Sequence, residues 1–336
     1  MRLFFALVCI LFLAQVVPAE SSEIKNQKKQ VHNPSLKQTS SKRVVKSQPS
    51  SNYFVKKEEK NFSLSLEARR FGRGEVIFFR LTPKDKKWIH ESFKANWLGK
   101  EVLLTKRDHS FVAFLPIAPD TPAGVMTLEI ISKIFFVKRG LKQYQIILEP
   151  TKFVVIKKQE IKVDDKFVSQ PLAKETLDFI EECKRAKTAA FSKLSQLQFN
   201  KNFKNPLETL YITSKFYVRR EYNKKMGRPH GGVDFRGKKG TPIYAVQDGT
   251  VVLAQKTYYE GNFTVIDHGN KIFTFYMHQD EIKVKTGDVV KQGQVIGTVG
   301  STGMSTGPHL HLGAKVADVL VDPLSLIALT GISEPN

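Results

Sequence analysis

Residues 305–312 read STGPHLHL and place two of the eight histidines of the chain, His309 and His311, two residues apart. The Gly-Pro step before them is typical of a turn, and the residues that follow have the composition of a β-strand. Side chains alternate between the two faces of a strand, so both imidazoles project to one face and Leu310 to the other. The stretch therefore predicts a β-strand that presents two histidines to one site.

The chain around this stretch has the pattern of a compact antiparallel β-domain. From about residue 205 onward, short apolar and β-branched runs alternate with turns rich in Gly and Asp, as in TPIYAVQDGTVVLAQ and KIFTFYMH. Five of the eight histidines fall in this part of the chain: His230, His268, His278, His309 and His311. We expect the domain to span residues 207–330 and to carry the chemistry of the protein.

A further histidine is paired with a carboxylate earlier in the same region. The segment PHGGVDF contains His230 and Asp234, and its two glycines favour a loop that runs into a strand over a helix. Because the spacing of four residues is even, these two side chains can also converge on one side. Histidine and carboxylate ligands suit Zn²⁺, and three protein ligands leave a fourth position open, as in catalytic sites. A lone histidine is more often structural, but the combination predicts one zinc ion per chain.

Three motifs together resemble a known family. GRPHGGVDF, the Tyr-x-His of FYMH, and GSTGMSTGPHLHL are similar to the zinc metallopeptidases of the LytM and lysostaphin type, which cleave peptide bonds in bacterial peptidoglycan. The resemblance covers about residues 207–327 and implies peptidoglycan as the substrate. The β-rich segment upstream resembles, less specifically, the N-terminal domain that accompanies some of these enzymes.

The resemblance also implies a role for each matching residue. His230, Asp234 and His311 correspond to the zinc ligands of the family. His309 corresponds to the catalytic histidine beside the metal, and His278 to a second catalytic histidine that orients water or stabilises charge.

One position departs from the family pattern. The family often has a Ser-x-Phe-Gly turn before the first ligand, whereas this chain has Ser214, Lys215, Phe216 and Tyr217 in that order. Because Tyr217 stands in the place of the glycine, the path of this loop toward the site is an open question at the level of sequence.

The N-terminal residues have the features of a secretory signal peptide. Arg2 is followed by an apolar run over residues 3–17 and by small residues around Ala19, so we expect residues 1–19 to be removed and the protein to be exported to the periplasm or cell wall. A membrane anchor is the alternative, but the run is shorter than the roughly 17–25 residues of a transmembrane helix. Cys183 is the one cysteine of the mature chain, which excludes an internal disulfide.

Residues 20–60 are rich in Ser, Lys, Gln and Asn without an apolar period, and we interpret them as a disordered basic tether. The net charge of the whole chain is +21. A basic surface attracts polyanions, and for an exported protein an anionic wall polymer or membrane surface is a better candidate than nucleic acid. We therefore expect electrostatic contact with the wall or membrane and no nucleic-acid partner, with a solvated lysine-rich surface as the alternative.

Residues 61–157 contain seven short strand patterns separated by turns such as PIAPDTPAG, which is typical of an immunoglobulin-like β-sandwich. His90 and His109 are isolated in this segment, and we interpret them as packing or surface residues.

Residues 158–206 lose the β pattern. Ser169 and Pro171 suit the start of a helix, and the apolar residues that follow, including Cys183, recur at helical spacing. The expected fold is therefore mostly β, with an N-terminal Ig-like β-sandwich, a short helical linker and a C-terminal compact antiparallel β metallopeptidase domain.

Three functions are compatible with these features. The intact set of ligands favours a secreted zinc-dependent peptidoglycan hydrolase that cleaves peptide cross-links or stem peptides. A non-enzymatic regulator or activator of other cell-wall hydrolases is the alternative, and polymer binding alone would fit only the basic N-terminal half. The motifs leave open whether the enzyme is an endopeptidase or a carboxypeptidase, and whether it cleaves polyglycine bridges or the D-alanyl–diaminopimelate bond. The lack of a wall-sorting tail or wall-binding repeat favours the second bond.

Overall fold

The structure is a computed structural model, and it describes residues 52–85, 92–134, 137–156, 167, 171–222 and 225–333. The predicted signal peptide, most of the predicted tether and His90 lie outside these residues. Strands dominate the described part of the chain, which also contains two α-helices, so the mostly-β class is confirmed. Neither helix is long and apolar enough to span a membrane.

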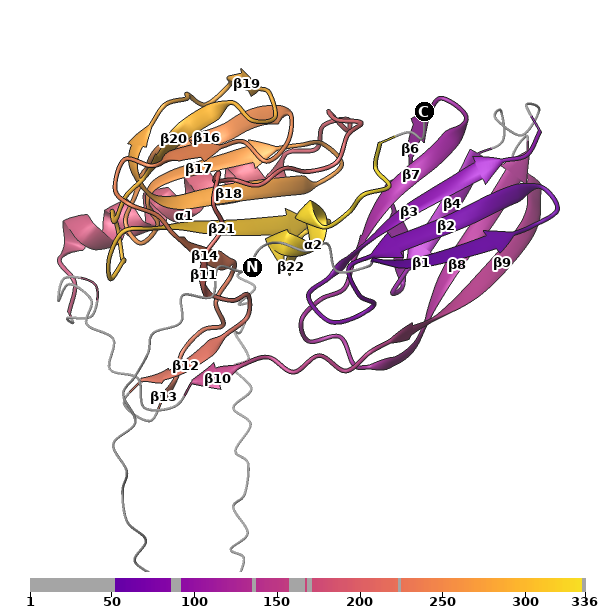
Figure 1. Cartoon of the computed structure of the whole chain (residues 1–336), viewed down its shortest axis with the longest axis horizontal. Coiled ribbons are helices and arrows are strands. Elements are labelled where there is room, and N and C mark those ends of the chain that lie inside the picture. The colour runs from indigo at the N-terminus through magenta and orange to yellow at the C-terminus, as the bar shows by residue number, and fades with distance from the viewer. Residues whose placement is uncertain are drawn as a thin grey trace, which may run out of the picture. The chain divides into compact units, whose positions relative to one another are not determined.

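Two antiparallel sheets form the N-terminal half of the described chain (Figure 1). The first has the order β1-β2-β3-β7-β6, with strands Tyr53–Glu58, Phe62–Ala68, Val76–Pro83, Ser110–Pro116 and Thr105–Arg107. The second has the order β5-β4-β8-β9, with strands Lys100–Val102, Ser92–Trp97, Gly124–Ile134 and Val137–Leu148. Apolar side chains from both sheets form one buried core, which includes Leu66, Phe79, Trp97 and Leu128.

The strands differ from the prediction at both ends of this region. Strand β1 lies within the predicted tether, and it pairs with β2 from Tyr53 to Glu58, while Val55 packs on the core. Tyr53, Phe54 and Val55 have high β-propensity, and the pairing with β2 stabilises the segment as a strand, so the prediction of a tether up to residue 60 is wrong for these residues. At the other end, β10 (Val155–Ile156) pairs in parallel with β12 (Arg219–Tyr222) and not with the sheets of the sandwich.

Strand β4 is not among the seven strand patterns identified in the sequence, although its residues alternate between apolar and polar. Phe93, Ala95 and Trp97 alternate with polar residues, and all three are buried. This period of two is the pattern of a strand with one face on the core.

The C-terminal region contains a ten-stranded sheet with the main order β11-β14-β21-β18-β17-β16-β19. In that order the strands are Ile212–Ser214, Val233–Arg236, His309–Val316, Ile272–Ile282, Gly261–Asp267, Gly249–Thr257 and Val289–Val290. Three further strands, β15 (Pro242–Tyr244), β20 (Val295–Val299) and β22 (Val319–Val321), pair at its margins. A hairpin of β12 and β13 (Lys225–Met226) lies beside β10. Neighbouring strands of the ten-stranded sheet are antiparallel, as expected.

Helix α1 (Lys174–Ser192) connects the two regions and packs on the C-terminal sheet. Ala190 and the ring of Phe191 contact a cluster that includes Phe273 and Phe275. Cys183 is 2 % exposed, in agreement with its position on the apolar stripe. Residues 193–206 of the predicted helical linker contain no helix.

The two β regions share a hydrophobic core. Phe78 and Phe114 of the sandwich strands belong to the same buried cluster as Phe199, Phe203 and the interior of the C-terminal sheet. Short helix α2 (Pro323–Ile327) is capped by Asp322, which also forms an ion pair with Arg69 of the sandwich at 2.6 Å. The sandwich is therefore an integral packing partner of the C-terminal domain.

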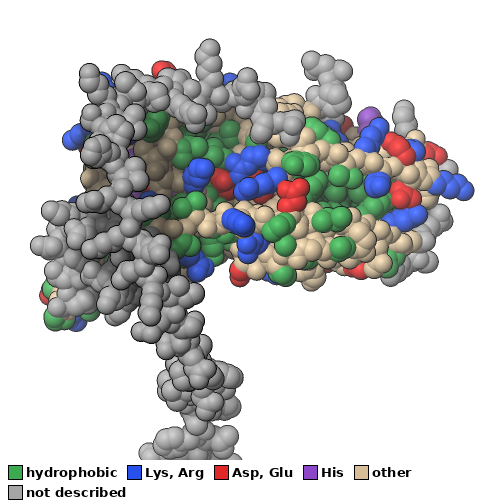
Figure 2. Space-filling view, turned by 60° about the horizontal axis from the view of Figure 1, so that its bottom comes forward, with side chains coloured by type: hydrophobic (Ala, Val, Ile, Leu, Met, Phe, Trp, Pro, Cys, Tyr) green, Lys and Arg blue, Asp and Glu red, His purple; other side chains and the backbone are tan. Residues whose placement is uncertain are grey.

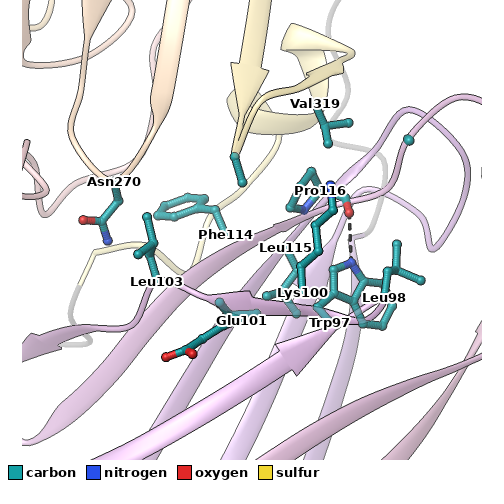
Figure 3. A pocket seen from close by; sticks show the side chains of 13 residues that line it. Trp97, Leu98, Lys100, Glu101, Leu103, Phe114, Leu115, Pro116, Asn270 and Val319 are labelled. Carbon is teal, nitrogen blue, oxygen red and sulfur yellow. Dashed lines mark hydrogen bonds between the residues drawn. The ribbon is translucent and has the colours of Figure 1, made fainter. Parts of the chain in front are cut away.

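A small, mostly apolar pocket of about 150 Å³ lies where Asn270 and Val319 approach the sandwich strands (Figure 3). Trp97 lines it and donates a hydrogen bond from Nε1 to Pro116 O at 2.9 Å. None of the five predicted site residues lines this pocket, so it is separate from the candidate centre.

Candidate metal centre

The pairing of β14 with β21 places Asp234 directly opposite His311. Their neighbours along the two strands are buried in the core: Val233, Phe235, Leu310 and Leu312. Because side chains alternate along a strand, Asp234, His309 and His311 lie together on the other face. One strand pair therefore brings three of the five predicted site residues to a common face.

Gly232 lets the loop that carries His230 approach β21 closely. A Cβ atom at this position would lie 2.2 Å from Leu312 O and 2.7 Å from His311 Nε2, so a larger residue would force the loop away. The adjacent Gly231 has no such restriction, since a Cβ there would meet only Leu320 Cδ2 at 4.0 Å. The second glycine of PHGGVDF is thus the one that admits His230 to the centre.

Three potential ligand atoms converge in this centre. Asp234 Oδ1 lies 2.9 Å from His230 Nε2 and 2.9 Å from His311 Nδ1, and the two nitrogens are 3.0 Å apart. Ligands with bonds of about 2.0–2.2 Å to a tetrahedral zinc ion are roughly 3.3–3.5 Å apart, so only a slight opening of the triangle is required. Within the described ranges, this is the one group of three or more His, Cys, Asp or Glu side chains with the geometry of a metal site.

The backbone around the first ligand fixes the tautomer of His230. Its Nδ1 lies 2.8 Å from Lys215 O, and a carbonyl oxygen only accepts, so Nδ1 carries the proton and Nε2 presents its lone pair to the centre. Ser214 Oγ lies 3.3 Å from the same Nδ1 and accepts a hydrogen bond from Arg220 Nη2 at 2.8 Å. The imidazole is thereby held in the orientation that metal ligation requires.

Tyr217 adopts the backbone conformation that favours glycine. Its φ is 61°, in the left-handed region, and this conformation costs an L-residue about 1–2 kcal/mol. Two backbone hydrogen bonds keep the loop on its path, from Tyr217 N to His230 O and from His230 N to Val218 O, both at 2.9 Å. The Tyr217 ring packs on Phe153, with centroids 4.6 Å apart, which helps to stabilise the strained residue. The substitution of tyrosine for glycine therefore leaves the approach of His230 intact.

The charges of Asp234 and His311 match those of metal ligands. Burial raises the pKa of the Asp234 carboxyl, but its short contacts with the imidazoles of His230 and His311 outweigh burial and hold that pKa well below the usual range. Burial lowers the pKa of His311, so this imidazole is neutral at pH 7. An ionised carboxylate beside a neutral imidazole is the protonation state in which both groups can bind zinc.

His309 and His278 lie beside the three converging atoms. The Nδ1 of His309 is 2.8 Å from Gly307 O, which leaves Nε2 as an acceptor 3.8 Å from Asp234 Oδ1. The rings of His278 and His309 have centroids 4.8 Å apart. Burial, with the nearby His309 and His311, lowers the pKa of His278 to about 3. All five predicted residues are thus brought together, with the imidazoles of His278 and His309 next to the ligand triangle.

Thr302 orients His278, a role that the sequence did not reveal. Its carbonyl oxygen accepts a hydrogen bond from His278 Nδ1 at 2.8 Å. Its hydroxyl donates to Gln279 O at 2.7 Å and accepts from Asn262 N at 2.9 Å, which ties the loop to two strands. The position of Thr302 within the GSTGMSTG turn is the signal that could have predicted it.

The remaining described histidines lie outside the centre. His268 is fully buried, with Nδ1 2.7 Å from Asp248 O and Nε2 2.8 Å from Thr274 Oγ1, and burial lowers its pKa to about 4. His109 is exposed in a turn of the sandwich. The placement of His109 agrees with its interpretation as a packing or surface residue, and His268 is a structural residue of the core.

Residues 228–323 match the model of Peptidase family M23. The chain is 42 % identical over 123 residues to the peptidoglycan DD-endopeptidase ShyB of Vibrio cholerae, which covers 35 % of this chain and 29 % of ShyB. It is 48 % identical over 101 residues to ShyA, also a peptidoglycan DD-endopeptidase of Vibrio cholerae, which covers 30 % of this chain and 24 % of ShyA. The C-terminal domain is thus an M23 peptidase domain, and the chain spans less than a third of the length of these relatives.

A solved structure extends the similarity beyond this domain. A Pseudomonas aeruginosa protein assigned to peptidase M23 has a TM-score of 0.55 and 26 % sequence identity, over 77 % of this chain and 96 % of that chain. The matched share exceeds the 228–323 segment, so the similar fold includes residues N-terminal to the M23 domain.

Proposed function

We propose that the protein is an exported, zinc-dependent hydrolase that cleaves peptide bonds in peptidoglycan. The observation that carries this proposal is the convergence of His230 Nε2, Asp234 Oδ1 and His311 Nδ1 within 3.0 Å of one another. Three such ligands leave one position for a water molecule or a substrate carbonyl. The intact set favours an enzyme over a regulator that lacks chemistry.

Electrostatics support the presence of a cation at this point. The proton on His230 Nδ1 is committed to Lys215 O, so the lone pair of Nε2 faces the carboxylate oxygen of Asp234 at 2.9 Å. Two acceptors at this distance repel each other unless a cation lies between them or beside them. The buried ligand triangle is therefore better satisfied with a divalent ion than without one.

The protein residues would divide the chemistry as follows. A zinc ion at this site would polarise the scissile carbonyl and make a water molecule more acidic. His309, whose Nε2 is free to accept, takes the proton of the attacking water and returns it to the leaving amine. His278, whose Nδ1 donates to Thr302 O, presents Nε2 as an acceptor that can orient the attacking water. Both roles need imidazoles that are neutral before the reaction.

The names of two relatives support a substrate for this chain. ShyA and ShyB are named peptidoglycan DD-endopeptidases, so we propose peptide cross-links as the substrate of this chain and endopeptidase activity before carboxypeptidase activity. The predicted signal peptide would deliver the protein to the periplasm, where this substrate lies.

The test is digestion of purified sacculi with the full mature chain, followed by mass spectrometry of the released muropeptides. Cross-linked dimers should decrease and monomers with new termini should appear, and a metal chelator should abolish the change until Zn²⁺ is restored. Intact dimers in the presence of a stoichiometric amount of zinc would contradict the proposal.

A further inference from the structure

A concave site lies next to β14, the strand that carries Asp234. It is a cavity of about 600 Å³ between the sandwich and the C-terminal domain, within the range of ligand pockets. Lys215 and Val233 line it, and both are next to the metal centre. The carbonyl oxygen of Lys215 accepts a hydrogen bond from His230, and Val233 directly precedes Asp234 in the sequence. Because Val233 and Asp234 point to opposite faces of β14, the cavity and the centre are separate but adjacent.

The lining of this cavity is strongly basic. Five Lys or Arg side chains and two acidic side chains line it, and the basic ones are Arg69, Arg70, Arg73, Lys152 and Lys215. Figure 2 shows Lys and Arg side chains gathered near the middle of one face of the molecule, among a few acidic and several hydrophobic ones.

Not all of these charges are available to a ligand. Arg69 is committed to Glu75 and Asp322, at 2.7 and 2.6 Å, and Arg70 shares the fully buried Glu75 at 2.8 Å. Lys152 and Lys215, in contrast, are exposed and form no ion pair with any residue that the structure describes. The cavity therefore keeps an excess of positive charge after its internal pairs are formed.

Arg73 is held in place by several contacts, but not all of its hydrogen-bond donors have a partner among the described residues. Its Nη2 donates to Thr151 O, its backbone N donates to Thr151 Oγ1 at 2.9 Å, and its guanidinium lies 5.6 Å from the centroid of the Phe153 ring. Its Nε is buried without a hydrogen-bond partner among the described residues. Arg73 therefore keeps hydrogen-bonding capacity that no described residue uses.

From these observations we propose that the cavity binds the carboxylates of a peptidoglycan stem peptide, next to the bond that is cleaved. This inference rests on the proposed function. A planar guanidinium matches the geometry of a carboxylate, and apolar residues such as Phe153 and Ile212 suit the aliphatic parts of a peptide better than a bare phosphate. An extended tetrapeptide spans at most about 14 Å. Lys215, which lines the cavity, also contacts His230 of the centre through its carbonyl oxygen.

The test uses the full mature chain and a soluble stem tetrapeptide with free carboxylates, compared with the same peptide after its carboxylates are converted to carboxamides. Calorimetry should show that the free acid binds about tenfold more tightly, as expected for at least one charge-assisted hydrogen bond. Lys152→Gln and Arg73→Gln should each reduce this preference, and Lys285→Gln, an exposed lysine in a distant turn, should leave it unchanged.

Two comparisons make the outcome decisive. His311→Ala should lose zinc and hydrolysis but keep the preference for the free acid, so the cavity can be present even if the proposed function fails. Equal binding of acid and amide by the unmodified protein, or an unchanged preference in Lys152→Gln and Arg73→Gln, overturns the proposal. Inorganic phosphate that binds at the same two residues while the tetrapeptide does not would assign the cavity to a phosphoryl ligand and overturn it as well.

Discussion

Asp234 Oδ1 and His311 Nδ1 are 2.9 Å apart because their residues face each other in the antiparallel pair β14–β21. The distance between the two side chains is thus set by strand register and not by a flexible loop. A shift of one residue would turn one of them to the opposite face and destroy the site.

This relationship makes His311 the most sensitive metal ligand to test. His311→Ala should bind less than stoichiometric zinc, since two ligands remain on the protein and the imidazole of His309 is held by Gly307 O. Inductively coupled plasma mass spectrometry of the purified variant measures the loss. An unchanged zinc content would contradict the assignment.

His309→Ala should separate metal binding from catalysis. The three ligand atoms are unaffected, so zinc stays bound, while hydrolysis falls by about 10²–10⁴-fold, the usual contribution of a positioned acid or base. Zinc stoichiometry and muropeptide release are measured on one preparation. A variant that is metal-free, or metal-bound and fully active, would refute this division of roles.

Gly232→Ala should disturb the centre although it removes no functional group. The new Cβ would meet Leu312 O at 2.2 Å, and the resulting displacement should cost about 1–3 kcal/mol of stability and weaken zinc binding. Gly231→Ala is the matched control, because its Cβ meets nothing closer than 4.0 Å. Thermal unfolding with and without zinc measures both effects, and equal behaviour of the two variants would be evidence against the close approach.

Stability should decrease when the pH falls from about 6.5 to 4, in part because of His268. Its pKa is lowered to about 4 by burial, whereas in the unfolded chain it is near the usual 6.5. Above pH 6.5 the imidazole is neutral in both states; between the two values only the unfolded state takes up the proton, so acidification favours unfolding by up to about 3 kcal/mol. Urea unfolding at several pH values measures the free energy of unfolding. This free energy should vary less with pH in His268→Gln than in the unmodified protein, whereas His109→Gln, which alters an exposed histidine, should leave the pH dependence unchanged.

The basic N-terminal segment should contribute to association with the wall. Deletion should remove residues 20–51 and not 20–60, because β1 begins at Tyr53 and pairs with β2. The shortened protein should pellet less with sacculi at low salt, where charges are least screened, and the difference should disappear at high salt. Identical pelleting at low salt would assign the segment a spacer role only.

The sequence by itself determined the β-rich character of the chain and the identity of the five candidate residues. A period of two places His309 and His311 on one face, and the intact motifs identify the M23 domain, because these signals are local and each depends on a few adjacent residues. The tertiary structure decided which atoms meet. The register between β14 and β21 places Asp234 directly opposite His311, and Lys215 O fixes the tautomer of His230.

Contacts between residues far apart in the chain were beyond the sequence for a physical reason. The carbonyl of Thr302 orients His278, and the loop around Tyr217 holds its left-handed residue by backbone bonds to His230. Backbone carbonyls and amides are the same in every residue, so no side-chain pattern reveals which of them a fold will use. Likewise, β1 contains the strand-forming residues Tyr53, Phe54 and Val55, and its pairing with β2 decides that this short segment is part of a sheet.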